Sequence, residues 1–334
     1  MRVGISGYGL AGRTFHAPLI AAQGHEIAGV LTTSSERTAQ LQEDFPGSSA
    51  LSTIDQLLDL DLDLLVVATA NHLHKEQALA AIARGIPVVV DKPFALSVID
   101  TREILDAAES AGVLVTTFFN RLWDSDTLTA ASVIADGSIG TAFRCESRFE
   151  RFRPELRPGA WRESGAANGG GLLFDLQPHL LSTALHLFGP AELVSASVRS
   201  IRGSGDDDVH LTLKHTSGVD SYLSASAIIG APGPRLRLSG SKGSLIVADL
   251  DPQEDLLRRG ERPVNESWSL DTRSETILFE GDKSKSYPSL PGNYGHFYSE
   301  VFSSVTSGTP LTVTHDLILS VATIIDLARE ISVR

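Results

Sequence analysis

The chain has 334 residues, 42% of them hydrophobic and 21% charged, a composition typical of globular proteins and a length that suits two domains. Its 28 basic and 41 acidic residues give a net charge of −13, which excludes proteins that bind nucleic acid or anionic membranes through charge. The single cysteine, Cys145, cannot form an internal disulfide, and no apolar run is long enough to span a membrane. No signal-peptide pattern precedes the first predicted strand, so we expect a cytoplasmic protein.

Short apolar runs alternate with helical patterns over residues 1–120, which predicts β–α units and a parallel sheet with helices on both faces. The predicted strands are nearly all apolar, as expected of strands buried on both faces. They are Arg2–Ser6, Glu26–Leu31, Leu64–Ala68, Pro87–Val90 and Val113–Phe118, and the helices are Leu10–Gln23, Ser35–Asp44, His74–Arg84 and Ser97–Ala111. The fold class is therefore α/β, with a doubly wound Rossmann domain over residues 1–120.

Residues 121–334 show a different pattern, in which several strands joined by short turns predict an open, mostly antiparallel sheet in an α+β domain. The predicted strands are Ala142–Phe152, Leu193–Arg202, Asp208–His215, Val219–Ile229, Pro234–Ser239 and Ser244–Ala248. Residues 251–290 are polar and broken by Pro and Gly, which predicts an irregular excursion. Two helices follow, Tyr294–Ser307 and His315–Val333, which are free to pack back on the first domain. Because an open sheet face needs covering, we expect a homodimer or homotetramer.

A G-x-G-x-x-G motif, Gly7-Tyr8-Gly9-Leu10-Ala11-Gly12, follows the first predicted strand and opens the first helix. In such a turn the first glycine permits a tight bend, the second lets the backbone approach a pyrophosphate, and the third packs the helix on the strand. The N–H groups at the start of the helix face the anion. In this context the motif predicts that residues 7–12 bind a dinucleotide, with a purely structural glycine turn as the alternative.

The end of the second predicted strand indicates which dinucleotide is bound. An acidic residue at this point binds the adenosine ribose of NAD, but the sequence after Val30 continues Leu-Thr-Thr-Ser-Ser-Glu-Arg, with no carboxylate at the tip. Thr33, Ser34 and Arg37 suit a 2′-phosphate, because hydroxyls donate hydrogen bonds and a guanidinium supplies positive charge. We therefore expect NADP as the preferred cofactor and leave NAD open. The alternative is a plain helix cap followed by a solvated arginine.

Two polar segments follow later strands of the parallel sheet, at the edge where ligands bind in such folds. Ala68–His74 follows the third strand, and Asp91-Lys92-Pro93 follows the fourth. Lys92 stands between an apolar strand and a proline, where its ammonium group can stabilise a negatively charged substrate oxygen. The alternatives are a solvated loop lysine and, for Asn71, a cap of the next helix.

The segment Gly169–Leu180 carries a second candidate for chemistry. Asp175 and His179 are four residues apart, which predicts that they lie one turn apart on one face of a helix. Histidine accepts protons near neutral pH, and a neighbouring carboxylate can orient it or bind a substrate hydroxyl. A buried Asp–His pair without a catalytic role is the alternative. No third or fourth ligand falls at a suitable spacing, so we expect no metal site.

Three motifs in this order, Gly7–Gly12, Asp91–Pro93 and Gly169–His179, make the chain similar to the Gfo/Idh/MocA family of oxidoreductases over nearly its whole length. That family pairs an N-terminal Rossmann domain with a C-terminal domain on an open antiparallel sheet. Further segments resemble a branch of the family that includes NADP-dependent scyllo-inositol dehydrogenases: Gly7–Pro18, Asn120–Asp124, Phe149–Pro154, Trp161–Glu163 and Asp175–His179.

The resemblance implies roles for individual residues. Lys92, Asp175 and His179 would form the catalytic trio. Thr69, Asn71, His74, Trp161 and Arg162 would contact the cofactor, and Asn120 would face the substrate. The family's usual Glu before the lysine is Asp91 here, and its usual Pro before Asn71 is Ala70, but neither change removes a catalytic residue.

These observations predict hydride transfer between a nicotinamide and a secondary alcohol or ketone of a sugar or cyclitol, so that a small polyol is the partner. Two alternatives stay open. A cofactor-binding sensor or regulator on the same fold has no need for Lys92, Asp175 and His179 together. A glycoside-processing enzyme that oxidises its substrate transiently would retain its cofactor tightly, because the cycle returns the cofactor unchanged.

Overall fold

The computed structural model describes residues 1–156, 169–263, 265, 268–269 and 276–332. By their contacts the residues form two compact units. The first unit comprises Met1–Phe118, Gln253–Trp268 and Tyr294–Leu319, and the second comprises Phe119–Pro252, Ser269–Asn293 and Ser320–Arg334.

The first unit is built on a parallel sheet with the strand order β3-β2-β1-β4-β5-β6. Its strands are β1 (Arg2–Ser6), β2 (Glu26–Leu31), β3 (Ser49–Leu51), β4 (Leu64–Val67), β5 (Val88–Val90) and β6 (Val115–Thr117). Strands β4, β5 and β6 are fully buried, in keeping with their apolar sequences. The order reverses between β1 and β4, which is the switch point of a Rossmann fold and confirms the α/β prediction.

Helices surround this sheet. They are the π-helical segment η1 (Ala11–His16), α1 (Ala17–Ala22), α2 (Ser35–Asp44), α3 (Ile54–Leu58), the 3₁₀ turn η2 (Asn71–Leu73), α4 (His74–Ile82), α5 (Val98–Ala111), α9 (Gln253–Arg258) and α10 (Gly295–Ser307). Helix α1 packs on β2 and on α10, whereas α4 packs on β4, β5 and α5. The serine before α2 and the one before α5 cap the helix through their hydroxyl groups, and Gly112 ends α5 in the left-handed conformation.

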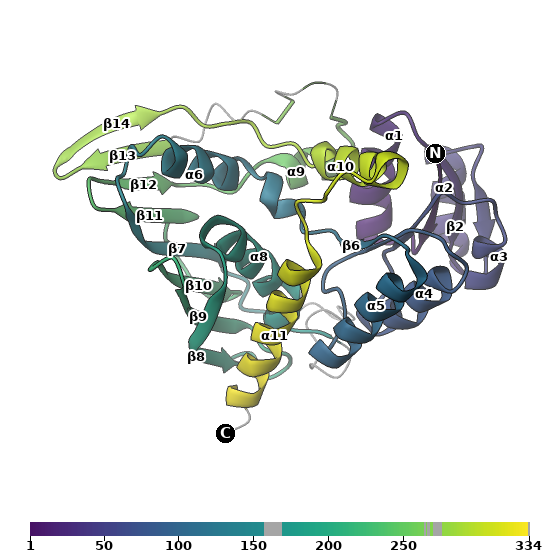
Figure 1. The fold of residues 1–334 in the computed structure, drawn as a ribbon, viewed down its shortest axis with the longest axis horizontal. Helices are drawn as coiled ribbons and strands as arrows, with labels where there is room; N and C mark the ends of the chain where they lie inside the picture. Colours follow the sequence, from purple (N-terminus) through teal and green to yellow (C-terminus); the bar gives the residue numbers. More distant parts are fainter. Residues whose placement is uncertain (157–168, 264, 266–267, 270–275, 333–334) are drawn as a thin grey trace. The chain divides into compact units, whose positions relative to one another are not determined.

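The second unit is built on an eight-stranded sheet with the order β14-β13-β12-β11-β7-β10-β9-β8 (Figure 1). Its strands are β7 (Ala142–Glu150), β8 (Ala191–Arg199), β9 (Asp208–His215), β10 (Asp220–Ser226), β11 (Leu236–Gly240), β12 (Ser244–Val247), β13 (Thr276–Glu280) and β14 (Lys283–Tyr287). All neighbours are antiparallel except β7 and β10, so the prediction of a mostly antiparallel sheet is confirmed.

Helices of the second unit cover part of this sheet. They are the 3₁₀ turn η3 (Asn120–Trp123), α6 (Ser125–Ala135), α7 (Leu172–Asp175) and α8 (Gln177–Phe188), and the long helix α11 (His315–Ser332) contributes its residues from Ser320 onward. Helix α8 contacts β7, β9 and β10, and α6 contacts β12. Along β9 the leucines Leu211 and Leu213 are buried while His210 and Lys214 are exposed, which is the alternation of a sheet with one covered face.

The prediction of an irregular excursion over residues 251–290 is wrong for part of that range. It contains α9 and the hairpin of β13 and β14, which extends the second sheet. Strand β14 reads Lys-Ser-Lys-Ser-Tyr and lies at the sheet edge, almost wholly exposed. Because an exposed edge strand needs no apolar alternation, its sequence carries little strand signal.

The prediction of one continuous helix through Asp175 and His179 is also corrected. Helix α7 ends at Asp175 and α8 begins at Gln177, with Leu176 between them. Pro178 occupies the first turn of α8, where a missing N–H is tolerated, but it cannot donate to a helical carbonyl four residues earlier. No element was expected over β3, α3 and α6, three short or weakly periodic segments.

Candidate cofactor and active site

The three glycines of the motif have different surroundings in the first unit. Gly7 has φ +100°, and a Cβ there would lie 2.6 Å from the carbonyl oxygen of Ala68. A Cβ on Gly12 would lie 2.0 Å from the carbonyl oxygen of Gly7. A Cβ on Gly9 would meet only the Arg37 side chain, at 3.8 Å. Gly7 and Gly12 therefore make the turn and the helix packing possible, while no backbone crowds Gly9 and only the Arg37 side chain lies near it, so the turn fits a dinucleotide pyrophosphate.

Of the larger side chains in the motif, Tyr8 is buried and anchors the turn, whereas Leu10 is exposed. Tyr8 is buried, and its hydroxyl donates to Asp44 Oδ2 at 2.9 Å, an atom that also accepts from Arg13 Nε at 2.7 Å. Burial, together with this carboxylate, raises the pKa of Tyr8, so the phenol stays protonated. Tyr8 thus ties the turn to the end of α2, and it is the backbone of the motif that is available to a ligand. The side chain of Leu10 is exposed.

The start of α2 carries the residues expected to distinguish the two cofactors. Ser34 Oγ accepts from the Arg37 backbone N–H at 3.4 Å, and Thr33 is exposed beside it. The Arg37 guanidinium lies over Gly9. Glu36 accepts from Gln40 Nε2 at 3.2 Å, so this carboxylate is engaged along α2. A positive group and two hydroxyls therefore stand at the tip of β2.

Two buried side chains join the carboxyl ends of the parallel strands. Gln77 Oε1 accepts from Ser6 Oγ at 2.9 Å and from Thr69 Oγ1 at 3.0 Å, so it links the ends of β1 and β4. His74 Nδ1 lies 2.8 Å from the Pro93 carbonyl oxygen, and its Nε2 lies 3.3 Å from that of Thr69. Burial lowers the pKa of His74, which keeps it neutral near pH 7. Asn71 is buried in η2, directly before α4.

Lys92 lies at the end of β5, in the segment that His74 holds. Its backbone N–H donates to Asp91 Oδ1 at 2.8 Å, and the bond between Lys92 and Pro93 is cis. The side chain is half-buried. The first unit therefore brings Lys92, Thr69, Asn71 and His74 to the sheet edge at which the glycine turn opens.

In the second unit, a carboxylate fixes the glycine-rich entry to α7. Asp206 Oδ2 accepts from the Leu173 backbone N–H at 2.7 Å, and the Asp206 carbonyl accepts from Leu172 N–H at 2.9 Å. Gly171 has φ +93°, and a Cβ there would lie 2.0 Å from Asp206 Oδ1, so only glycine permits this approach. Burial raises the pKa of Asp206. This contact sets the direction in which α7 presents Asp175.

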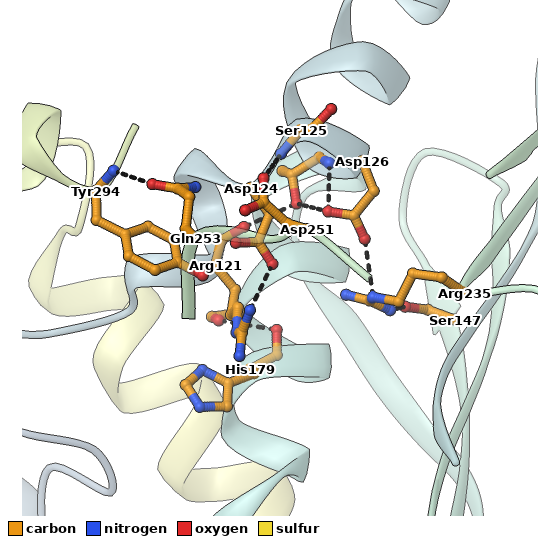
Figure 2. Close-up of polar contacts among 12 residues, drawn as sticks. Arg121, Asp124, Ser125, Asp126, Ser147, His179, Arg235, Asp251, Gln253 and Tyr294 are labelled. Atoms are coloured by element: carbon orange, nitrogen blue, oxygen red, sulfur yellow. Dashed lines mark hydrogen bonds and ion pairs between the residues drawn. The ribbon is translucent and has the colours of Figure 1, made fainter. Parts of the chain in front are cut away.

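His179 is buried in the first turn of α8 and packs edge-on against Phe149, with 6.3 Å between the ring centroids. The Phe149 ring also contacts two guanidinium groups, those of Arg121 at 5.4 Å and Arg235 at 4.1 Å. Figure 2 shows the Arg121 guanidinium pointing toward the His179 imidazole while it pairs with Asp124, at 3.2 Å. His179 therefore lies beside a positive group whose position is fixed by an aromatic ring and a buried carboxylate.

The predicted site residues fall into both units. Asp175, His179 and the buried Asn120 belong to the second unit, and the candidates from Gly7 to Lys92 belong to the first. Trp161 and Arg162 lie outside the described residues. Among the residues that the structure describes, no group of His, Cys, Asp and Glu side chains could hold a metal ion. Within the same residues, every helix is too short or too polar to cross a membrane.

Sequence reasoning missed the side chains that hold the candidates in place, above all Gln77, Asp206 and Arg121. For Gln77 and Arg121, the spacing to a polar residue three positions away in the sequence could have indicated a contact. Gln77 follows His74 by three residues on a largely apolar helix, and Arg121 precedes Asp124 by three. Asp206 had no such signal, because it lies 33 residues from its partner Leu173.

Comparisons with known proteins agree with these two units. Residues 1–119 match a family model described as an oxidoreductase family with an NAD-binding Rossmann fold. Residues 127–246 match the Gfo/Idh/MocA C-terminal domain.

Similar proteins cover from about three quarters to nearly all of the chain. The scyllo-inositol 2-dehydrogenase (NADP⁺) IolW of Bacillus subtilis is 34% identical over 99% of this chain and 94% of its own length. The 1,5-anhydro-D-fructose reductase of Ensifer adhaerens is 31% identical over 73% of this chain and 75% of its own. The solved structure of the oxidoreductase yvaA from Bacillus subtilis covers 99% of this chain and 96% of its own, with 31% identity and a TM-score of 0.91. The chain therefore belongs to the Gfo/Idh/MocA family of NAD(P)-binding oxidoreductases.

Proposed function

We propose that this protein is an NADP-preferring dehydrogenase that oxidises a secondary alcohol of a sugar or cyclitol, or reduces the matching ketone. The observation that carries the proposal is Lys92, held at the sheet edge where the glycine turn opens by a hydrogen bond to Asp91 and by the anchored Pro93 carbonyl. The names of two similar proteins, a scyllo-inositol 2-dehydrogenase and an anhydrofructose reductase, support a polyol or sugar as the substrate.

Three side chains of the chain are proposed to act on the substrate. The imidazole of His179 accepts the proton of the reacting hydroxyl as general base. The Lys92 ammonium group donates a hydrogen bond to the same oxygen and stabilises the negative charge that develops on it. Asp175 orients the imidazole or accepts a hydrogen bond from a neighbouring hydroxyl. When bound, the nicotinamide supplies a hydride acceptor, or a donor in the reverse direction.

The preference for NADP is proposed from the tip of β2. Arg37 and the hydroxyl groups of Thr33 and Ser34 can bind a 2′-phosphate, and residues 31–35 contain no carboxylate that would repel it. Similarity to the scyllo-inositol 2-dehydrogenase (NADP⁺) of Bacillus subtilis supports the same choice. We also propose a cytoplasmic location.

The function is tested with a panel of inositols and sugars, each with NADP⁺ and NAD⁺, while the absorbance of reduced nicotinamide is followed. With the best substrate, Lys92→Met is expected to lower kcat by about 10²-fold or more, because no ammonium group then stabilises the negative charge that develops on the substrate oxygen. NADP binding, measured by fluorescence titration, is expected to persist. Lys75→Met is the control, since Lys75 pairs with Asp100 and Glu103 on the outer helices. Near-full turnover by Lys92→Met would refute the assignment.

Cofactor preference is tested separately. Arg37→Ala is expected to raise KM for NADP⁺ about 10-fold or more and to leave KM for NAD⁺ within about two-fold, because only NADP⁺ carries the 2′-phosphate. Arg84→Ala serves as control, because this arginine pairs with Asp55 and Asp59. An equal change for both cofactors would contradict the assignment of Arg37.

A further inference from the structure

A fully buried histidine lies behind the Lys92 segment in the first unit. His16 ends η1, and each of its ring nitrogens faces a different element. Its Nδ1 lies 2.6 Å from the Tyr298 hydroxyl on α10, and its Nε2 lies 3.9 Å from Asp91 Oδ1. The ring packs against Phe118, with 4.5 Å between centroids. Four distant parts of the sequence therefore meet at this imidazole.

The surroundings select one protonation state of His16. Burial lowers its pKa to about 4, against opposing attraction from Asp91 and with a smaller contribution from His74 in the same direction. The imidazole is therefore neutral at pH 7 and carries one N–H. With that proton on Nδ1, the lone pair of Nε2 would face the Asp91 carboxylate, which is repulsive. With the proton on Nε2, the N–H faces Asp91 and Nδ1 accepts from Tyr298, whose pKa burial raises so that it stays a donor.

A buried histidine stabilises the fold less than an apolar side chain of similar size would. Within the described part of the chain, His16 Nε2 has no hydrogen-bond partner, and a buried N–H without one destabilises a fold. An apolar side chain would fill the same space against Phe118 without that cost. Nε2 forms an ion-pair contact with Asp91 Oδ1 at 3.9 Å. We infer that a histidine is present at this position, despite its unfavourable burial, because it interacts electrostatically with this carboxylate.

Asp91 Oδ1 has a second partner, the backbone N–H of Lys92 at 2.8 Å. A rotation of the carboxylate away from His16 would therefore also release the N–H of Lys92. On the other side, His74 holds the Pro93 carbonyl at 2.8 Å. Lys92 is thus bracketed by two buried histidines, one acting through Asp91 and one through Pro93.

We propose that His16, with its tautomer set by the Asp91 carboxylate and accommodated by the Tyr298 hydroxyl, is a positioning residue for Lys92 that acts through Asp91. The inference rests on the proposed catalytic role of Lys92. It predicts that the Nε2–H of His16 is needed for turnover although His16 touches neither substrate nor cofactor.

Two substitutions separate the two nitrogens. His16→Gln keeps an N–H near the position of Nε2, whereas His16→Asn keeps a polar atom near Nδ1 and has nothing that reaches Asp91. With NADP⁺ and scyllo-inositol, or the better polyol of the panel, His16→Asn is expected to lower kcat about 10-fold or more, whereas His16→Gln is expected to keep kcat within about three-fold of the wild type. The NADP dissociation constant is expected to stay unchanged in both. Phe118→Leu is the matched control, because it loosens packing on the same ring while it leaves the polar contacts: Tm is expected to fall and kcat per folded molecule to stay constant.

The tautomer is measured without substrate or cofactor, by long-range ¹H–¹⁵N correlation in the selectively labelled full-length protein. His16 is expected to be neutral with the proton on Nε2 at pH 7, and Asp91→Asn, whose amide can either accept from or donate to Nε2, is expected to remove this preference. A proton on Nδ1 in the wild type, or equal kcat in His16→Asn, His16→Gln and the wild type, would overturn the inference. If Lys92→Met retains turnover, the proposed function fails. If only Lys92→Met is impaired, the positioning role alone fails.

Discussion

At the scale of single residues, one glycine of the motif is needed for the stability of the fold and another for cofactor binding, and substitutions can separate the two effects. Gly12→Ala is expected to destabilise the fold, because its Cβ would lie 2.0 Å from the Gly7 carbonyl oxygen, and to lower Tm by several degrees. Gly9→Ala adds a methyl group to the surface of the turn without a clash, because its Cβ would contact only the Arg37 guanidinium, at 3.8 Å. It is expected to keep Tm while it weakens NADP binding about 10-fold or more, because the pyrophosphate would need that space.

Thermal unfolding of the cofactor-free proteins and fluorescence titration with NADP provide the two measurements. Gly47→Ala is a control for the loss of a glycine as such, because a Cβ there would meet no atom within 4 Å. An unchanged affinity for NADP in Gly9→Ala would place the dinucleotide elsewhere.

Buried histidines make the stability of the fold depend on pH. Burial lowers the pKa of His16 to about 4, whereas an unfolded histidine has a pKa of about 6.5, so between these values the unfolded chain binds a proton that the folded chain does not. The free energy of unfolding must therefore fall as the pH falls from 6.5 toward 4, by up to about 3 kcal/mol for this group. The pKa of His74 is lowered in the same way, which adds to the loss.

Urea unfolding at pH 7 and pH 4.5 checks this expectation. The wild type should lose more stability over that interval than His16→Gln, in which the titrating group is absent. Equal losses in the two proteins would show that His16 does not contribute.

At the scale of elements, a buried ion pair ties α6 to the second sheet. Arg235 Nε lies 2.8 Å from Asp126 Oδ2, both side chains are buried, and Arg235 also donates to Ser147 Oγ at 2.6 Å (Figure 2). Asp126→Ala is expected to lower the free energy of unfolding by about 3–5 kcal/mol, because it leaves the Arg235 charge buried without its partner.

Asp59→Ala is the matched control for this pair. Asp59 pairs with Arg84 at 2.7 Å, but its side chain is 73% exposed, so its loss is expected to cost at most about 1 kcal/mol. Urea unfolding measures both. Similar losses in the two variants would show that the Asp126 pair is as solvated as a surface pair.

At the scale of the whole molecule, one face of the second sheet is expected to bind a second copy of the chain. Tyr222 alternates on β10 with the buried Ser221 and Leu223, so it points away from the covered face, and it remains 40% exposed under the Arg144 guanidinium. We expect a homodimer or homotetramer by light scattering after size exclusion. Tyr222→Glu is expected to shift it toward smaller species, whereas Ile99→Glu, an exposed apolar residue of the first unit, should not. A monomeric wild type would contradict this expectation.

Much of the architecture followed from sequence because its signals are local. Apolar runs of β4 and β5, the serine cap before α5 and the glycine turn after β1 each need only neighbours in the chain to be recognised. The elements that were missed have weak local signals. The edge strand β14 is polar, and α7 stops before α8 although the spacing of Asp175 and His179 fits a single helix.

By itself the sequence determined the two fold types, the glycine-rich turn and the candidate side chains, because a motif and its periodicity are properties of adjacent residues. Only the tertiary structure decided what holds those side chains. His16 meets Tyr298 across 282 positions, and Leu173 meets Asp206 across 33, so neither contact leaves a trace in spacing. The environment that makes His16 neutral is likewise produced by burial, which exists only once distant segments have packed together.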